Sequence, residues 1–301
     1  MAAVICGSLA FDTIMTFEGR FSEQILPDQL HILNVSFLVP ALRRDFGGCA
    51  GNIAYCLKLL GGRPLPMATL GSDGAEYLER LQGQGISTEF VSQVQDIYTA
   101  QAMIMTDRDN NQITAFHPGA MMQAHRTKIA ARSDIRLGII SPDGRDAMLE
   151  HAQQFQAAAI PFVFDPGQGL PMFDGVELTD FIDQASWVTV NDYEGKMLCD
   201  RTGLSNADIS RRLEGLVVTL GGEGCEVWVG GEKTVVPPVK AKDVVDPTGC
   251  GDAWRGALLY GLEQGWDLPR CAALGNRVGA IKIASRGPQN YELGTLSPWP
   301  E

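Results

Sequence analysis

The stretch Asp246-Pro247-Thr248-Gly249-Cys250-Gly251-Asp252 decides how the rest of the chain is interpreted. Apolar residues recur at helical spacing over 253–262, which predicts that the stretch is a loop opening a helix. The small residues Gly249, Cys250 and Gly251 leave the first-turn N–H groups unshielded, and those groups have no acceptor within the helix. Together with the positive end of the helix dipole, they predict an anion-binding site.

Asp252 places a carboxylate beside this anion site. The combination suits a phosphoryl group in transit, because the carboxylate can take the proton of the attacking hydroxyl. A glycine-containing turn in which Asp252 only caps the helix is the alternative that these residues leave open. The position at a helix N-terminus predicts that Asp252 favours its charged form.

Composition limits the classes of protein that the chain can represent. Its 301 residues, 45% apolar and 20% charged, suit one large α/β domain with a real core. The net charge of −12 argues against nucleic acid or an anionic membrane as a general partner. Seven scattered cysteines without a CxxC pair predict reduced thiols and a cytoplasmic location. We expect neither a membrane span nor a signal peptide.

Short apolar runs alternate with helical patterns, as in a mostly parallel sheet. The sequence predicts strands over 4–8, 66–70, 137–140, 161–164, 187–190 and 216–220, and helices over 77–81, 147–159, 253–262 and 269–284. Polar or glycine-rich loops follow these strands, among them 191–194 and 221–224. Functional groups of an open parallel sheet gather at this edge, so we expect the site there.

A second glycine turn, Gly47-Gly48-Cys49-Ala50-Gly51-Asn52, precedes another expected helix. Its glycines permit close approach of a ligand, and Asn52 offers both a donor and an acceptor. Strands expected over 13–17 and 32–39, with a hairpin over 99–105 and 112–116, suggest a smaller second sheet. We expect it to form a lid from insertions at about 12–45 and 97–120 within a single domain, 1–301. The alternative is that this smaller sheet is a β-extension of the domain without a role in covering the site.

The two glycine turns lie roughly two hundred residues apart, and together they resemble the paired signature of the ribokinase (PfkB-type) carbohydrate and nucleoside kinases. The resemblance covers essentially the whole chain and is strongest to bacterial nucleoside kinases related to adenosine kinase. It implies a three-layer α/β/α fold with a β-sheet lid. It also implies Mg²⁺-dependent transfer of the ATP γ-phosphoryl group to the ribose 5′-hydroxyl of adenosine, inosine or guanosine.

The resemblance assigns roles to individual positions. It makes Asp252 the catalytic base and the amides of Gly249, Cys250 and Gly251 the anion hole. The expected substrate-binding residues are Ser8, Asp12, Gly48, Asn52, Gln101, Met103, Phe116 and Gln168. The expected ATP-binding residues are Asn191, Thr219, Gly221, Gly224 and Asn276. Glu194 would organise Mg²⁺ through water, and Asp246 and Thr248 would lie near a monovalent cation such as K⁺.

Several alternatives stay open at this point. Gln101, Met103 and Phe116 could instead form packing within the lid, because alternating apolar residues on a strand usually face a core. Arg255 replaces an uncharged residue of many family members; we expect it to face solvent, with a phosphate contact as the alternative. We expect His117, next to Pro118, to be a loop residue, with a ligand contact as the alternative. The chain could also be a sugar kinase for ribose or fructose, or a non-catalytic nucleoside-binding protein, and it could be a monomer or a homodimer through the lid.

Overall fold

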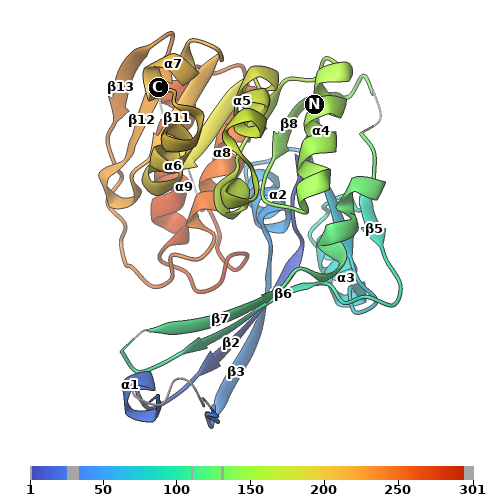
Figure 1. Ribbon diagram of the computed structural model, residues 1–301, viewed down its shortest axis with the longest axis vertical. Helices are drawn as coiled ribbons and strands as arrows, with labels where there is room; N and C mark the ends of the chain where they lie inside the picture. Colours follow the sequence, from blue (N-terminus) through green and yellow to red (C-terminus); the bar gives the residue numbers. More distant parts are fainter. Residues whose placement is uncertain (1, 26–33, 110, 130–131, 295–301) are drawn as a thin grey trace.

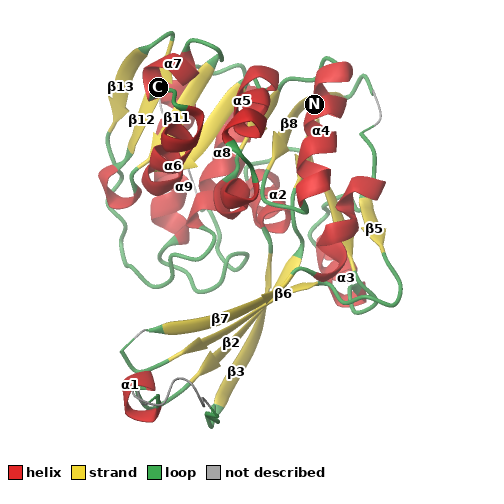
Figure 2. Ribbon diagram, viewed as in Figure 1, coloured by secondary structure: helices red, strands yellow, loops and turns green. Residues whose placement is uncertain are grey.

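The computed structural model describes residues 2–25, 34–109, 111–129 and 132–294. A nine-stranded sheet runs through the body with helices on both of its faces, and a separate four-stranded sheet projects from one end (Figure 1). Figure 2 shows that the projecting sheet has no layer of helices over it. The α/β fold expected from the sequence, with its second, smaller sheet, is therefore confirmed.

The central sheet has the strand order β13-β12-β11-β10-β9-β8-β1-β4-β5. The strands are β1 (Ala2–Cys6), β4 (Pro64–Leu70), β5 (Val91–Gln93), β8 (Ile135–Ile140), β9 (Phe162–Phe164), β10 (Trp187–Asn191), β11 (Gly215–Thr219), β12 (Cys225–Val229) and β13 (Glu232–Val236). Neighbours from β5 to β11 are parallel, and β12 and β13 add an antiparallel edge.

Strand β1 shows why the apolar runs of this chain form a buried sheet. All of its residues are buried. Ala3 and Ile5 join the core on one face, beneath α2 (Cys49–Leu59), α3 (Ala75–Gly83), α8 (Cys250–Glu263) and α9 (Leu268–Lys282). Val4 and Cys6 join the core on the other, beneath α4 (Arg145–Ala157), α5 (Gly175–Gln184), α6 (Asp192–Thr202) and α7 (Asn206–Ser210). A parallel sheet covered on both faces requires such unbroken apolar strands.

The projecting sheet, called the lid sheet below, has the order β3-β2-β6-β7. Its strands are β2 (Ala10–Thr16), β3 (Ala41–Gly47), β6 (Ala100–Thr106) and β7 (Gln112–His117). It therefore draws on two separated parts of the chain, as the sequence predicted. The remaining short elements are α1 (Phe21–Gln24) and the 3-10 turns η2 (Gly119–Arg126), η3 (Gly167–Met172) and η4 (Gly221–Glu223).

One lid strand lies elsewhere than predicted. We expected it over 32–39; residues 32 and 33 lie outside the described residues, and 34–39 form no strand. The strand is β3, which is an edge strand and mostly exposed. Its middle carries Arg43, Arg44 and Asp45, so the alternation of apolar residues that marks a half-buried strand is missing. His117, expected in a loop, is the last residue of β7.

Candidate active site

Two helix N-termini meet at the centre of the site. Helix α2 begins after Gly48, whose φ is 86°, and helix α8 begins after Gly249, whose φ is 76°. The two helices pack against each other. In their first turns, the Asn52 Nδ2 donates a hydrogen bond of 2.7 Å to the Asp252 Oδ2. The two glycine turns of the sequence are thus brought into direct contact.

Asp252 is a stronger base than its place at a helix N-terminus predicted. Its pKa is raised to about 6, chiefly by burial among protein atoms and also by Asp165, although the hydrogen bond from Asn52 lowers it. Desolvation therefore opposes the helix dipole, and the carboxylate stays mostly charged at neutral pH, as expected, but is a stronger base than an exposed aspartate. A carboxylate with a pKa near neutrality is well suited to accept a proton at neutral pH.

Asn52 is held in one orientation by a chain of hydrogen bonds. The Gln289 Nε2 donates to the Asn52 Oδ1 at 3.0 Å and to the Tyr77 hydroxyl oxygen at 2.8 Å. The Tyr77 hydroxyl in turn donates to the carbonyl of Gly47 at 2.7 Å. Because the Asn52 oxygen is engaged with Gln289, its amide N–H groups face Asp252. Gln289 and Tyr77 were not predicted as site residues, because neither belongs to the two glycine turns.

Glycine is required where β2 and the first turn of α2 approach each other. A Cβ at Gly48 would lie 2.5 Å from the carbonyl oxygen of Ser8, and a Cβ at Gly47 would lie 2.3 Å from the Asp12 Oδ2. The Ser8 hydroxyl accepts a hydrogen bond from the backbone N–H of Cys49 at 3.2 Å. Ser8, Asp12, Gly48 and Asn52, which the resemblance assigned to the substrate, therefore lie around one helix start.

The Asp12 carboxyl group is largely buried near other carboxylates at this helix start. Burial, together with the carboxylates of Asp45, Asp252 and Asp246, raises its pKa to about 7, although Arg43 acts in the opposite direction. A proton held here would let the carboxyl group donate a hydrogen bond as well as accept one. Such a group suits the hydroxyls of a sugar, which both donate and accept.

The lid sheet separates the three residues that we expected around a nucleobase. The register pairs Asp12 with Ala102 and Ala102 with Phe116, so these side chains share one face of the sheet. Gln101 and Met103 alternate with Ala102 and therefore point to the opposite face. The Gln101 Nε2 donates to the Thr13 hydroxyl at 2.6 Å on that face. The structure thus brings Phe116, but not Gln101 or Met103, to the side of Asp12.

Asp252 lies in a polar cleft of about 420 Å³ at the carboxyl ends of the central strands. The cleft is lined by Cys49, Pro142, Asp165, Gly167, Gln168, Asn191, Asp192, Glu194, Thr219, Gly221, Gly249, Gly251, Asp252 and Arg255. Gln168, expected at the substrate, is among them. Of the three expected anion-hole amides, that of Cys250 donates to the Pro247 carbonyl at 3.1 Å within the loop.

An apolar cavity of about 680 Å³ adjoins the cleft and shares Thr219, Gly221 and Gly251 with it. Its wall includes Gly224, Pro238, Val239, Val244, Trp254, Asn276 and Ile283. The Asn276 side chain accepts from the Trp254 Nε1 at 3.0 Å and donates to the Pro237 carbonyl at 2.9 Å. The expected ATP-binding residues Thr219, Gly221, Gly224 and Asn276 are therefore gathered around one cavity of suitable polarity for a purine.

Arg255 is buried, which corrects our expectation that it faces solvent. Its residue is 6% exposed, and its Nη2 lies 2.9 Å from the Asp165 Oδ1 and 3.8 Å from the Glu194 Oε2. One turn after Asp252, the helix faces a cleft lined by carboxylates, and a guanidinium is the side chain that compensates two of them. Asp165, which follows strand β9, is a site residue that we had not singled out.

The segment 191–194, expected as a loop, begins helix α6. The Asn191 Oδ1 accepts from the backbone N–H of Glu194 at 2.7 Å, and the Glu194 Oε2 accepts from the backbone N–H of Asn191 at 2.8 Å. This is a reciprocal capping box, and it keeps Glu194 directed at the cleft. Burial raises the pKa of Glu194, and Arg255 lowers it.

The carboxylate of Asp246 folds the loop that leads to Gly249. Its Oδ1 accepts from the N–H of Thr248 and its Oδ2 from the N–H of Gly287, each at 2.9 Å. Arg43 lies 3.6 Å from the same Oδ2. The side chain is thus engaged by donors, and the monovalent cation expected near Asp246 and Thr248 stays a prediction.

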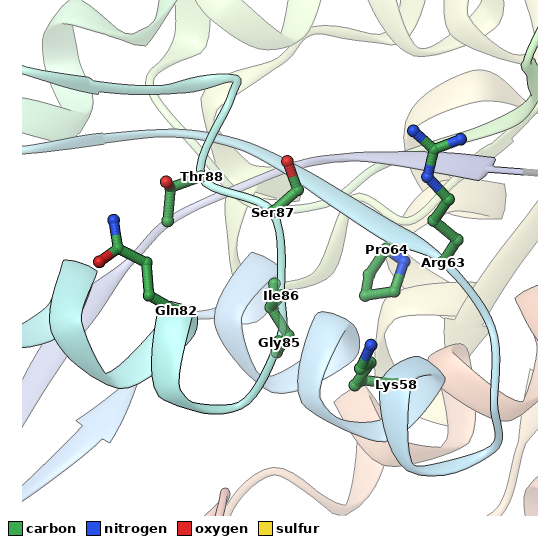
Figure 3. Close-up of a pocket in the computed structure, with 8 residues that line it drawn as sticks. All are labelled: Lys58, Arg63, Pro64, Gln82, Gly85, Ile86, Ser87 and Thr88. Atoms are coloured by element: carbon green, nitrogen blue, oxygen red, sulfur yellow. The ribbon is translucent and has the colours of Figure 1, made fainter.

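A third hollow lies away from these residues (Figure 3). Lys58, Arg63, Gln82, Ser87 and Thr88 contribute to it, near the C-terminal end of α2 and therefore at the end opposite Asn52. Arg63 is paired there with Asp134 at 2.9 Å. None of the residues expected at the site lines this hollow.

Across 2–25, 34–109, 111–129 and 132–294, we find no helix with the length and apolar character of a membrane span.

Comparison with known proteins agrees with this geometry. The sequence pattern of the pfkB family carbohydrate kinases matches residues 13–293, and the chain belongs to this family. A nucleoside kinase of Methanocaldococcus jannaschii is 28% identical over 96% of this chain and 93% of that protein.

Solved structures of a nucleoside kinase from Burkholderia thailandensis superpose on the chain. The complex with inosine has 52% sequence identity and a TM-score of 0.87, over 96% of this chain and 93% of that one. The complex with ADP-inosine has 53% identity and a TM-score of 0.84, over 96% and 91% of the two chains. The fold is therefore that of the ribokinase-like kinases.

Proposed function

We propose that the chain is an ATP-dependent nucleoside kinase that transfers the γ-phosphoryl group to the ribose 5′-hydroxyl of a purine nucleoside. The observation that carries this proposal is the hydrogen-bonded pair of Asn52 and Asp252 at two adjoining helix starts. On one side lie Asp12 and Ser8, which suit a sugar. On the other side lies the apolar cavity around Asn276, which suits the adenine of ATP.

Asp252 takes the proton of the 5′-hydroxyl as that oxygen bonds to the γ-phosphorus. The bond from this phosphorus to the β-bridging oxygen breaks, and ADP leaves with the electron pair. The N–H groups of Gly249 and Gly251, at the start of α8, would meet the negative charge on the transferred group. Positioning and charge stabilisation contribute most to such a loose transition state, so a base with a pKa of about 6 is sufficient.

The donors of the cleft fit magnesium. Asp165 and Glu194 present carboxylates to it, and within the described residues no group of three or more His, Cys, Asp or Glu could hold a metal ion alone. Magnesium usually keeps several waters and binds to one or two carboxylates together with substrate phosphates. Glu194, oriented by Asn191, would hold the ion through water, and the ion would supply charge neutralisation at the ATP phosphates.

One feature favours a nucleoside over a free sugar as the acceptor. Phe116 lies on the same face of the lid sheet as Asp12, and 53% of its surface is exposed. An exposed aromatic ring beside the expected ribose site offers a surface on which a purine can stack. A free ribose or fructose leaves that ring without a partner.

The test is a panel of acceptors with ATP and Mg²⁺, run with and without K⁺. We expect ADP and a nucleoside 5′-monophosphate from adenosine, inosine or guanosine, with little product from ribose or fructose. Deoxynucleosides should be poor acceptors, because the groups that bond the missing hydroxyl stay unpaired. Turnover of free sugars alone would indicate a sugar kinase. Binding of nucleoside in a thermal-shift assay without any turnover would indicate a binding protein.

The location and assembly of the chain are part of the same proposal. All seven cysteines are free, as expected in a reducing cytoplasm. Strand β7 is an exposed edge of the lid sheet, so a homodimer could form by pairing at this edge, with a monomer as the alternative. Light scattering during gel filtration distinguishes the two.

A further inference from the structure

Lys282 is a buried cation that the mechanism above does not use. It is the last residue of α9, and its side chain is 0% exposed. A lysine without exposure to water requires partners for its ammonium group. The Nζ donates to the backbone carbonyl of Asp246 at 2.8 Å and to that of Ser285 at 3.2 Å. These carbonyls belong to two separate segments, which the ammonium joins.

One of the two segments leads directly into the anion hole. Asp246 lies three residues before Gly249, the residue that precedes α8. The backbone N–H groups of Val245 and Asp246 both donate to the carbonyl of Ile283, at 2.8 and 3.1 Å, so this segment is attached to the end of α9. Helices α8 and α9 also pack side by side (Figure 1). The Lys282 ammonium therefore holds the backbone carbonyl of Asp246 in the loop that leads into the anion hole.

Acidic groups near the ammonium offset part of the cost of burying its charge. Burial lowers the pKa of Lys282, while the groups that face it, the thiol of Cys250 and the carboxylates of Asp246, Asp252 and Asp45, raise it. It also lies at the C-terminal end of a helix, where the dipole favours a positive charge. Backbone carbonyls around a positive charge are also the surroundings that proteins offer to a dehydrated K⁺ ion.

We propose that the Lys282 ammonium is the built-in cation of the phosphoryl-transfer site, taking the place of a bound monovalent metal ion beneath the anion-hole loop. The proposal rests on the proposed function. Its consequence is that the chain transfers phosphoryl groups without K⁺. Lys282 acts as a positioning residue: it holds the Asp246 carbonyl, and through the loop it orients the N–H groups of Gly249 and Gly251.

The experiment measures nucleoside phosphorylation with Mg²⁺ and ATP as tetramethylammonium salts, to which KCl, NaCl or NH₄Cl is added at constant ionic strength. We expect the unmodified chain to have the same kcat in every salt. Lys282→Ala removes the charge and leaves a space lined by carbonyls, so the anion-hole N–H groups lose their orientation and kcat should fall by ~10²–10³, comparable to the loss of one anion-hole donor. Addition of K⁺, NH₄⁺ or methylammonium should restore at least a tenth of the kcat that the substitution removes. The KM for the nucleoside should change little.

The control is Lys128→Ala, which removes an exposed lysine paired with Glu150. It should keep the kcat of the unmodified chain and gain no response to salts. Circular dichroism and nucleoside binding show whether Lys282→Ala is folded. If it does not fold, the salt response of the unmodified chain still tests the proposal.

Two results would overturn the inference. The first is a clear stimulation of the unmodified chain by K⁺, which shows that an external cation is required. The second is a folded Lys282→Ala that no cation restores. Neither result affects the proposed function, whereas an unmodified chain without turnover in any salt rejects that function.

Discussion

Asn52 and Asp252 lie 200 residues apart in the chain, and their side chains are joined by a hydrogen bond of 2.7 Å. Each residue stands in the first turn of its helix, and the two helices pack together. The groups expected to receive the phosphoryl acceptor and to take its proton are therefore held by one rigid unit.

Asp252→Asn should abolish proton transfer while leaving the shape of the site intact. An amide is isosteric with the carboxylate but cannot accept the proton of the acceptor hydroxyl. We expect kcat to fall by ~10²–10⁴, the usual contribution of a general base. The dissociation constant for inosine, measured by calorimetry, should stay nearly the same.

The matched control is Asp267→Asn, which changes an exposed aspartate that caps α9 through the N–H of Arg270 at 2.9 Å. Asparagine caps a helix as well as aspartate does, so this variant should keep full activity. If Asp252→Asn were equally active, Asp252 would be a helix cap and not a base.

The pH dependence of kcat/KM should follow the ionisation of Asp252. Burial raises its pKa from 3.8 to about 6, and only the charged form can accept a proton. Activity should therefore be full above this pKa and decline by about tenfold per pH unit below it. The apparent value belongs to a coupled system, because Asp12 also has a raised pKa, of about 7.

Asn52→Ala provides the check on the cause of this pKa. The hydrogen bond from Asn52 lowers the pKa of Asp252, so its loss should move the acid limb of the profile to higher pH. A profile of the unmodified chain that stays flat down to pH values near the ordinary aspartate range would contradict the assignment.

Arg255→Met should destabilise the fold strongly. Arg255 lies 2.9 Å from Asp165 and 3.8 Å from Glu194, and all three side chains are largely buried. Loss of one partner from a buried ion pair leaves uncompensated charge and costs ~3–5 kcal/mol of unfolding free energy. Urea denaturation measures this change.

Arg212→Met is the comparison for that measurement. Arg212 lies 3.2 Å from Asp183, but both side chains are well exposed, and such pairs contribute ~0–1 kcal/mol. Equal losses of stability in the two variants would mean that burial does not set the strength of the Arg255 pair.

Gly48→Ala should damage the start of α2 more than Gly61→Ala damages its end. Gly48 and Gly61 have φ values of 86° and 88°, so alanine is strained at both positions, by an amount on the order of 1–3 kcal/mol. A Cβ at Gly48 would also lie 2.5 Å from the Ser8 carbonyl oxygen, whereas a Cβ at Gly61 meets nothing within 4 Å. Thermal melting and activity should both be lower for Gly48→Ala; equal effects would refute the importance of this close approach.

The buried strands and the two glycine turns could be predicted because their signals are local. Strand β1 is an unbroken apolar run, and the start of α8 follows from small residues before a helical pattern. Strand β3 could not be predicted in the same way, because an exposed edge strand tolerates charges such as Arg43 and Arg44 on its faces.

The failures within the site share a physical cause. Arg255 resembled a solvent-facing residue because its partners, Asp165 and Glu194, follow different strands and meet it only in the folded chain. The same holds for Gln289, which orients Asn52 from 237 residues away. That Gln101 and Met103 lie on the face opposite Phe116 could not be predicted, because the facing of side chains across a sheet depends on the strand register.

The division between body and lid sheet has a consequence for how such enzymes diversify. Asp252, the first-turn amides of α8 and the apolar cavity proposed for ATP all lie in the body, while Phe116 stands on β7 at the outer edge of the lid sheet. If Phe116 contacts the acceptor as proposed, we expect changes along that edge to alter which acceptor is preferred while Asp252 and its amides stay unchanged. The same catalytic body could in this way serve acceptor molecules of different shape through substitutions in the lid sheet alone.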